Sequence, residues 1–141
     1  MKMTNRPQSN TWSRLLSLLA IGFGLLTLRE GGAVLFVDGA ARRDAGHYVS
    51  FVLRFNFLAG FAYIAAGVGL WMRRRWAAWL ALAIAVATAL VFLAFGVHVA
   101  LGGAWEQRTV VAMTLRTLIW VGIATIAWRR SATNAQATRE H

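Results

Sequence analysis

Four long apolar stretches, separated by short polar connectors, dominate the pattern of residues along the chain. They cover residues 12–37, 48–72, 76–103 and 109–128, and each reaches the roughly 20 residues that a helix needs to cross a bilayer. Short runs of alternating polarity, typical of an outer-membrane β-barrel, do not occur. The pattern therefore predicts an all-α polytopic membrane protein, a bundle of four transmembrane helices over residues 12–128.

The polar segments around this domain define its boundaries. We expect residues 1–11 to form a flexible cytoplasmic N-terminus and residues 129–141 a cytoplasmic tail. Arg29-Glu30-Gly31-Gly32 interrupts the first apolar stretch, and we expect the helix to loosen at the glycine pair. The alternative is a secretory signal cleaved near Gly39-Ala40-Ala41, but the charges that precede this site favour a spanning helix.

The composition supports a membrane location. The hydrophobic fraction is 58% and the charged fraction 14%, whereas soluble domains average about 45–50% and about 25%. A soluble chain of 141 residues has too small an interior to bury so much apolar surface. We therefore expect the lipid bilayer to cover this surface and to be the chain's principal partner.

Basic residues are distributed unequally between the two sets of connectors, which sets the expected orientation. The richer side holds Lys2, Arg6, Arg14, Arg73, Arg74, Arg75, Arg129, Arg130 and Arg139, and the other side holds Arg42, Arg43 and Arg108. Connectors rich in lysine and arginine stay on the cytoplasmic side of a membrane. The bias predicts that both termini are cytoplasmic and that the protein lies in a bacterial inner (plasma) membrane.

The residue types present exclude several kinds of chemistry. The chain has no cysteine, which excludes disulfides, thiol redox chemistry, Fe–S clusters and c-type haem attachment. Of its three histidines, His141 lies in the polar tail, and His47 and His98 are far apart, so we expect no metal site and no cofactor. The net charge of +10 is split into short clusters between apolar runs, so we expect no nucleic-acid partner.

Polar residues inside the apolar stretches mark a candidate site, because such groups are costly in a membrane and are usually functional. At about 1.5 Å per residue, Glu30, Arg54, His98 and Arg116 each lie roughly 8–10 Å from the outer end of their helix. We therefore predict an outward-facing polar pocket without a catalytic residue. Its predicted binding residues are Glu30, Asn56, Tyr63, His98, Glu106 and Arg116.

Several of these residues also have a purely structural interpretation. Arg54 shares a helical face with Phe57 and Leu58 and can extend along lipid to the membrane surface. Asn56 lies on a face with Tyr63 that looks like a bundle interior, where its amide can bond to another helix. His98 can equally be a core histidine with satisfied hydrogen bonds.

Arg116 is the hardest of these residues to explain without a partner. It lies deep in the fourth stretch, so we expect a carboxylate beside it, either Glu30 or Glu106. Such a pair would be a structural salt bridge or part of a functional site, and the sequence leaves both open. The stretch Glu106–Thr109 is also a candidate cap that begins the fourth helix and closes the cluster from outside.

Small residues predict where the helices approach one another, because close packing in lipid needs small side chains. Ala77, Ala81, Ala85 and Ala89 recur at every fourth position of the third stretch and predict a ridge against a neighbouring helix. The alternative is that this ridge faces lipid. The short turn at residues 73–75 predicts antiparallel pairing of the second and third helices.

The stretch AGFAYIAAGVGLWMRRRWAAWLALAIA, residues 59–85, resembles the central helix pair of the DoxX-type small bacterial membrane proteins. The resemblance implies a four-helix membrane protein of similar length, and some members of that family are linked to quinone-dependent oxidation of thiosulfate. No functional residue of that family corresponds to Glu30, His98 or Arg116.

Three functions follow from these features. The first, which we favour, is a non-enzymatic membrane protein whose pocket binds a small anionic or polar ligand in transport, sensing or accessory binding. The second is a structural or accessory subunit that associates with another membrane protein or with a second copy of itself. The third is a quinone-linked redox enzyme that uses His98 or Tyr63 as a proton donor.

Overall fold

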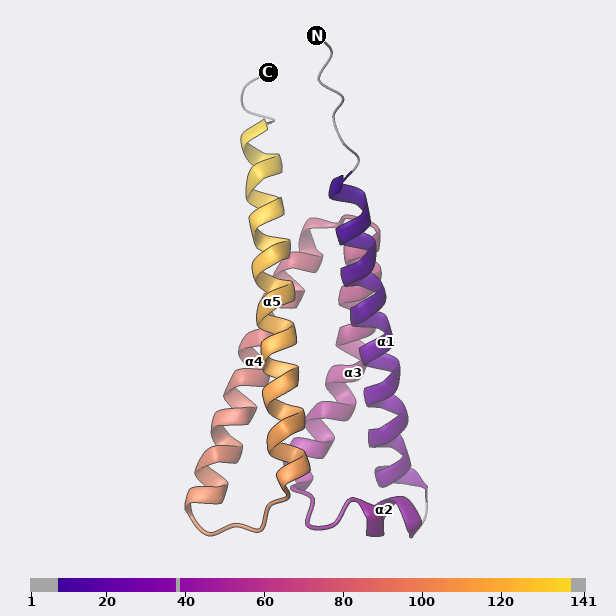
Figure 1. Ribbon diagram of the computed structural model, residues 1–141, viewed down its shortest axis with the longest axis vertical. Helices are drawn as coiled ribbons and strands as arrows, with labels where there is room; N and C mark the ends of the chain where they lie inside the picture. The colour runs from indigo at the N-terminus through magenta and orange to yellow at the C-terminus, as the bar shows by residue number, and fades with distance from the viewer. Residues whose placement is uncertain (1–7, 38, 138–141) are drawn as a thin grey trace.

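The computed structural model describes residues 8–37 and 39–137, and these residues form five helices and no strand. The helices are α1 (Gln8–Phe36), α2 (Ala40–Asp44), α3 (Ser50–Trp71), α4 (Arg75–Ala100) and α5 (Gln107–Ala137). Figure 1 shows the four long helices running along one axis, with the start of α1 and the end of α5 together at one end and α2 at the other. These are termed the terminal end and the α2 end. The predicted all-α class is confirmed for the described residues.

Four of the helices are long and apolar enough to cross a membrane: Thr11–Phe36, Ser50–Trp71, Arg75–Ala100 and Gln107–Ala132. Their outward faces carry large apolar side chains, such as Leu58 and Leu93, each 67% exposed. Water would solvate such a surface poorly, whereas lipid covers it without cost. The fold is therefore that of a multi-pass membrane protein, as the sequence predicts.

The first helix differs from the prediction in two ways. It begins at Gln8, inside the segment expected to be flexible, and residues 1–7 lie outside the described residues. It also continues through Gly31 and Gly32 without a break, so the predicted loosening is wrong. A Cβ atom on Gly31 would lie 3.3 Å from the Cβ of Phe57, so the glycine lets α3 approach α1 closely rather than weakening the helix.

The other boundaries move for local reasons. Helix α4 ends at Ala100, before the predicted end at residue 103, because Gly102 takes a left-handed conformation with φ of 84°. The Gly103 N–H then donates to the His98 carbonyl, which closes the helix end. Helix α5 continues to Ala137, so much of the predicted tail is helical, and residues 138–141 lie outside the described residues. The predicted connector before α3 contains the additional helix α2.

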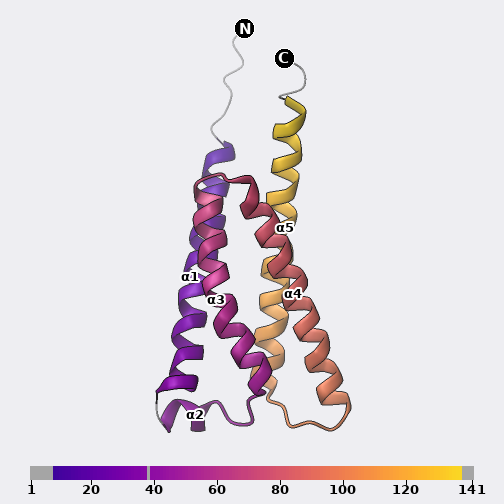
Figure 2. The same cartoon turned by 180° about the vertical axis from the view of Figure 1, so that it is seen from behind.

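Helices α3 and α4 form the predicted antiparallel pair, but they touch along only part of their length. They meet at the turn around Arg73 and diverge toward the α2 end (Figure 2). Small residues lie near the turn: a Cβ atom on Gly69 would fall 2.8 Å from the Cβ of Ala77. Larger side chains such as Phe95, which is buried, fill the space farther from the turn and keep the helices apart.

The alanine ridge of α4 faces the bundle over most of its length. Ala77 and Ala81 are fully buried and Ala85 is 5% exposed, in agreement with the packing interpretation. Ala89 is exposed, so the ridge leaves the interior where α4 diverges from α3. Ala81 and Ala85 belong to the central apolar cluster together with Tyr63 and Trp120.

Helices α1 and α3 pack closely because glycines replace larger side chains where they cross. A Cβ atom on Gly24 would lie 2.9 Å from the Gly60 carbonyl oxygen. A Cβ atom on Gly67 would lie 2.6 Å from Ile21 Cγ1 and 3.0 Å from the Ser17 carbonyl oxygen. Real Cβ atoms essentially never approach other atoms this closely, so any larger residue must push the helices apart.

We expect Gly67→Ala to lower the free energy of unfolding in detergent by about 1–3 kcal/mol, because the added methyl group meets the α1 backbone. In an open position the same change should stabilise a helix by roughly 1 kcal/mol, since alanine is the better helix former. Gly122→Ala supplies that control, because nothing lies within 4 Å of its Cβ position. Equal stability of the two variants would show that α1 and α3 do not pack as described.

Candidate functional site

A cavity of about 680 Å³ lies between α1, α2, α3 and α5 at the α2 end of the bundle. Ionisable and polar side chains line it together with apolar ones, whereas the cluster at the centre of the bundle is apolar. The polar and ionisable residues of the lining include Thr27, Glu30, Asp44, Asn56, Arg108 and Arg116. A cavity of this volume is within the usual range for small-molecule sites, roughly 300–1,000 Å³.

The packing of the long helices explains why this space exists. Helix α1 packs along α3, α4 packs along α5, and α3 joins the two pairs, whereas α1 and α5 make few direct contacts. The interval between α1 and α5 is bridged by long side chains, chiefly Arg116, whose guanidinium lies 5.5 Å from the centre of the Phe23 ring. Toward the α2 end the cavity occupies this interval.

Arg116 forms the inner end of the cavity and is only 8% exposed. Its Nη2 donates to Thr27 Oγ1 at 3.4 Å, and its Nη1 contacts Met113 Sδ at 3.9 Å. These are long contacts to neutral, weak acceptors. Its Nε is buried and has no hydrogen-bond partner. A buried guanidinium with so few acceptors has strong potential for binding an oxyanion.

The carboxylate partner expected for Arg116 is not found. No salt bridge involves Arg116 within residues 8–37 and 39–137, so the predicted pairing with Glu30 or Glu106 is wrong. Glu30 is exposed on the α1 wall of the same cavity, one helical turn nearer the α2 end than Thr27, which contacts Arg116. The structural salt bridge considered for this cluster is therefore absent.

Glu106 instead links two connectors at the mouth of the cavity. Its Oε1 accepts the backbone N–H of His47 at 3.0 Å and lies 3.6 Å from His47 Nδ1. Glu106 also precedes the first residue of α5, and its carbonyl accepts the Thr109 N–H at 2.9 Å. Helix α5 begins at Gln107, two residues before the predicted start, and the Glu106 side chain binds His47 and does not cap the helix.

Asn56 lies on the α3 wall of the cavity, near its inner end. Its Nδ2 donates to Met113 Sδ at 3.7 Å, whereas its buried Oδ1 has no partner. Arg116 and Asn56 both line the cavity, and each also has a buried polar atom without a partner, Arg116 Nε and Asn56 Oδ1.

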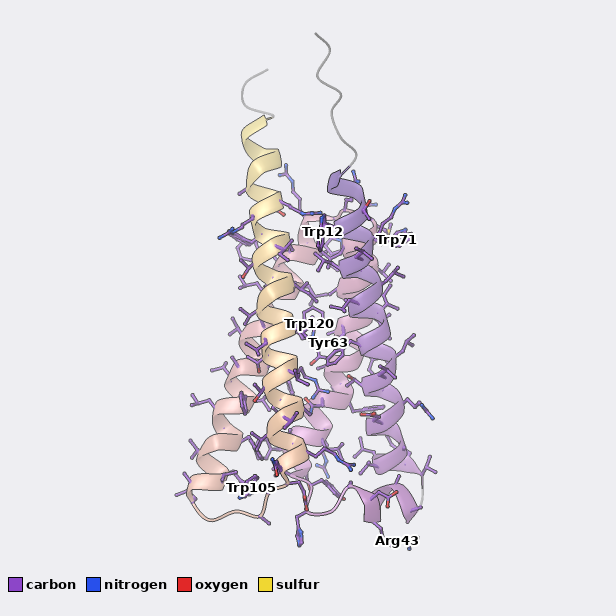
Figure 3. The ribbon with its side chains drawn as sticks, in the orientation of Figure 1. Trp12, Arg43, Tyr63, Trp71, Trp105 and Trp120 are labelled. Carbon is purple, nitrogen blue, oxygen red and sulfur yellow. The ribbon has the colours of Figure 1, made fainter. Side chains whose placement is uncertain are left out.

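Tyr63 lies beyond the inner end of the cavity, in the centre of the bundle. It is fully buried, and its ring lies 4.6 Å from that of Trp120 and 5.8 Å from that of Phe23, measured between centroids. Figure 3 shows Tyr63 and Trp120 together at mid-height between the helices. Tyr63 does not line the cavity, and its hydroxyl is buried beside the Thr88 side chain.

His98 is not brought together with the other predicted residues. It lines a separate surface hollow with Arg54 and His47, and its Nε2 is 3.3 Å from the Ala104 carbonyl oxygen. Its ring meets that of Phe51 edge-on, with the centroids 6.1 Å apart. Arg54 is exposed, as expected for a side chain that extends toward the membrane surface.

Sequence analysis missed several polar residues that line the cavity, among them Thr27, Asp44 and Arg108. Thr27 precedes Glu30 by one helical turn, so its place on the same face was available from the spacing. Asp44 and Arg108 looked like ordinary connector charges, and only the fold of α2 and the start of α5 brings them to the cavity.

Among the described residues, no group of three or more histidine, aspartate or glutamate side chains is placed to hold a metal ion. The arrangement at the cavity is instead one of separate charges around a polar space. Comparison of the chain with known proteins finds no matching family model, no matching curated protein and no matching solved structure.

Proposed function

We propose that this chain is a bacterial inner-membrane protein with both termini in the cytoplasm, so that the cavity opens toward the outside. The basic residues at the terminal end support this orientation, since they include Arg73, Arg74 and Arg75 at the α3–α4 turn. Tryptophans lie near both ends of the bundle, with Trp12 and Trp71 at the terminal end and Trp105 at the α2 end (Figure 3). Such residues typically flank the hydrocarbon region.

Reporter fusions test this orientation. Fusions after residue 45 and after residue 104 should report an outside location, because both positions lie in connectors of the α2 end. Fusions at residue 75 and at the C-terminus should report an inside location. An outside signal from the C-terminal fusion would contradict the proposed topology.

We further propose that the cavity binds a small polar ligand through an oxyanion group, in transport, sensing or accessory binding. The observation that carries this proposal is Arg116, a guanidinium 8% exposed, without a carboxylate partner, at the inner end of a cavity. An arginine in an apolar bundle is costly unless it is paired or hydrated. A ligand oxyanion would supply the acceptors that the protein does not.

The competing functions receive less support. A subunit whose polar cluster only fixes helix register would be expected to pair its buried charge internally, and Arg116 has no such pair among the described residues. A DoxX-like role in quinone-linked redox chemistry remains a proposal based on resemblance in residues 59–85, where Tyr63 is the one candidate proton donor inside the bundle.

A single introduced cysteine tests the cavity directly, because the chain has none of its own. Ala112 lines the cavity one turn from Arg116 toward the α2 end. We expect Ala112→Cys to react in intact cells with a membrane-impermeant methanethiosulfonate. An anionic reagent should react faster than a cationic one, after each rate is divided by that of a free thiol, and Arg116→Gln should remove this preference.

Ala89→Cys is the matched control, because Ala89 is exposed on the outer face of α4, away from the cavity. A thiol that faces lipid does not ionise, and only the thiolate reacts. We therefore expect no labelling at this position. Failure to label Ala112→Cys from outside, in protein that is folded by its melting curve, would contradict the proposed pocket.

A further inference from the structure

The two walls of the cavity carry opposite charges. Arg108 and Arg116 lie on α5, whereas Glu30 lies on α1 and Asp44 on α2. None of these four side chains forms a salt bridge within the part of the chain that the structure describes. The remaining carboxylate, Glu106, is already bound to His47. Two guanidinium and two carboxyl side chains thus face one space without forming a salt bridge with one another.

This separation of charge restricts what the cavity can hold. A simple anion at Arg116 would be repelled by Glu30 and Asp44, and a simple cation near those carboxylates would be repelled by the two guanidiniums. A neutral molecule would leave the buried Arg116 uncompensated. A molecule that carries both charges, oriented with its anion toward α5, is attracted by both walls.

The hydrogen-bonding atoms at the inner end have the same double character. The Arg116 guanidinium is a hydrogen-bond donor, and the Asn56 side chain carries an acceptor oxygen. An oxyanion pairs with the guanidinium, and an ammonium group donates to an amide oxygen. Arg116 is more than nine-tenths buried at the cavity's end, so its guanidinium fixes where the anionic group lies.

The spacing of the charges sets an approximate size for the ligand. Arg116 contacts Thr27, and Glu30 lies three residues farther along α1 toward the α2 end, a rise of about 4.5 Å. A two- or three-carbon chain between the oxyanion and the ammonium group spans such an interval. We propose that the ligand is a zwitterion of this kind, an oxyanion and an ammonium group on a short chain, as in phosphoethanolamine or the head group of phosphatidylethanolamine.

This inference rests on the proposed pocket. A second cysteine position allows the pocket and the zwitterionic ligand to be tested separately. Ala33 lines the α1 wall, one turn from Glu30. We expect Ala33→Cys to prefer the cationic reagent and Ala112→Cys the anionic one, each by roughly tenfold after correction for intrinsic rates. Glu30→Gln should reduce the cationic preference at residue 33 and raise the rate of the anionic reagent at residue 112. Labelling at residue 112 then also shows that the variant folds.

Protection by added compounds identifies the charge type of the ligand. Phosphoethanolamine should slow labelling at both positions, inorganic phosphate only at residue 112, and ethanolamine only at residue 33. To distinguish a lipid head group from a water-soluble ligand, labelling is repeated on protein in nanodiscs. Protection in phosphatidylethanolamine but not in phosphatidylglycerol identifies the lipid, and protection only by added phosphoethanolamine identifies a water-soluble ligand.

Two results would overturn the inference. If both positions prefer the anionic reagent and phosphate protects as well as phosphoethanolamine, the site binds a simple oxyanion, and the zwitterion is wrong although the pocket stands. If residue 33 is labelled without any charge preference, the α1 wall does not act on the ligand, and the inference again fails. Absence of labelling at residue 112 would remove the pocket itself and the inference with it.

Discussion

Replacement of Arg116 by methionine is expected to stabilise the purified protein in mild detergent, by about 1–2 kcal/mol in the free energy of unfolding. Arg116 is 8% exposed, and its guanidinium contacts Thr27, Met113 and the Phe23 ring, none of which is charged. Removing it therefore leaves no buried charge behind. Methionine has a similar length and an apolar, flexible side chain that suits these neighbours.

The same variant should lose the charge selectivity measured at residue 112, so stability and function would change in opposite directions. Such a result is typical of a functional residue that is retained despite its cost. Glu30→Gln should change stability by less than about 1 kcal/mol, because Glu30 is exposed and forms no salt bridge in the described chain. The effects of the two substitutions should then add.

A structural salt bridge would give the reverse pattern. Arg116→Met alone would then destabilise by about 3–5 kcal/mol, because a buried carboxylate would be left without its partner. Replacing both residues would recover much of that loss. Thermal and chemical unfolding of the two single variants and the double variant distinguishes the two cases by the sign of the Arg116→Met effect.

Replacement of Trp120 by alanine should cause the largest loss of stability, about 3–5 kcal/mol. Trp120 is fully buried, and its ring lies 4.6 Å from that of Tyr63 in the central apolar cluster. The indole Nε1 has no hydrogen-bond partner, so the loss comes from packing and from the cavity left behind. The measurement is chemical unfolding in detergent, followed by the fluorescence of the remaining tryptophans.

Trp79→Ala is the matched control for this prediction. Trp79 is 62% exposed on α4, and its only ring contact among the described residues is an edge-on pair with Trp128, with the centroids 4.8 Å apart. Its loss should cost no more than about 1.5 kcal/mol, the upper value of such an aromatic pair. Similar losses for Trp79→Ala and Trp120→Ala would show that the central cluster does not hold the bundle together.

The sequence was sufficient to predict the four long helices, because the pattern that indicates each of them lies within its own residues. An apolar run of membrane length predicts a spanning helix whatever surrounds it, and all four predicted stretches correspond to long helices in the structure. The errors concern single residues, either at helix ends or at points of close helix packing. Gly102 stops α4 through its left-handed backbone, and Gly31 serves close packing against Phe57 rather than flexibility.

The candidate site was predictable only in part. Depth along the helix predicted Glu30 and Arg116 for one polar site, and both line the cavity, because rise per residue is nearly constant in a helix. Asn56, predicted from its helical face, and Glu106, predicted from its position before the fourth helix, line it as well. Depth does not specify which helices are neighbours. For this reason it could not predict that His98 lies on a different face of the bundle. The pairing of Arg116 also depends on distances of a few ångströms between helices, which no sequence pattern encodes.

The order of helix packing bears on how the protein is made. The α1–α3 pair comes from residues 8–71, so it can form in the membrane while the ribosome is still synthesising the α4–α5 pair. Arg116 lies on α5 and arrives last. Before α5 is inserted, Glu30 and Asn56 lie on a surface that α5 later covers. A nascent chain that stalls at this stage would expose these polar groups to quality-control proteases.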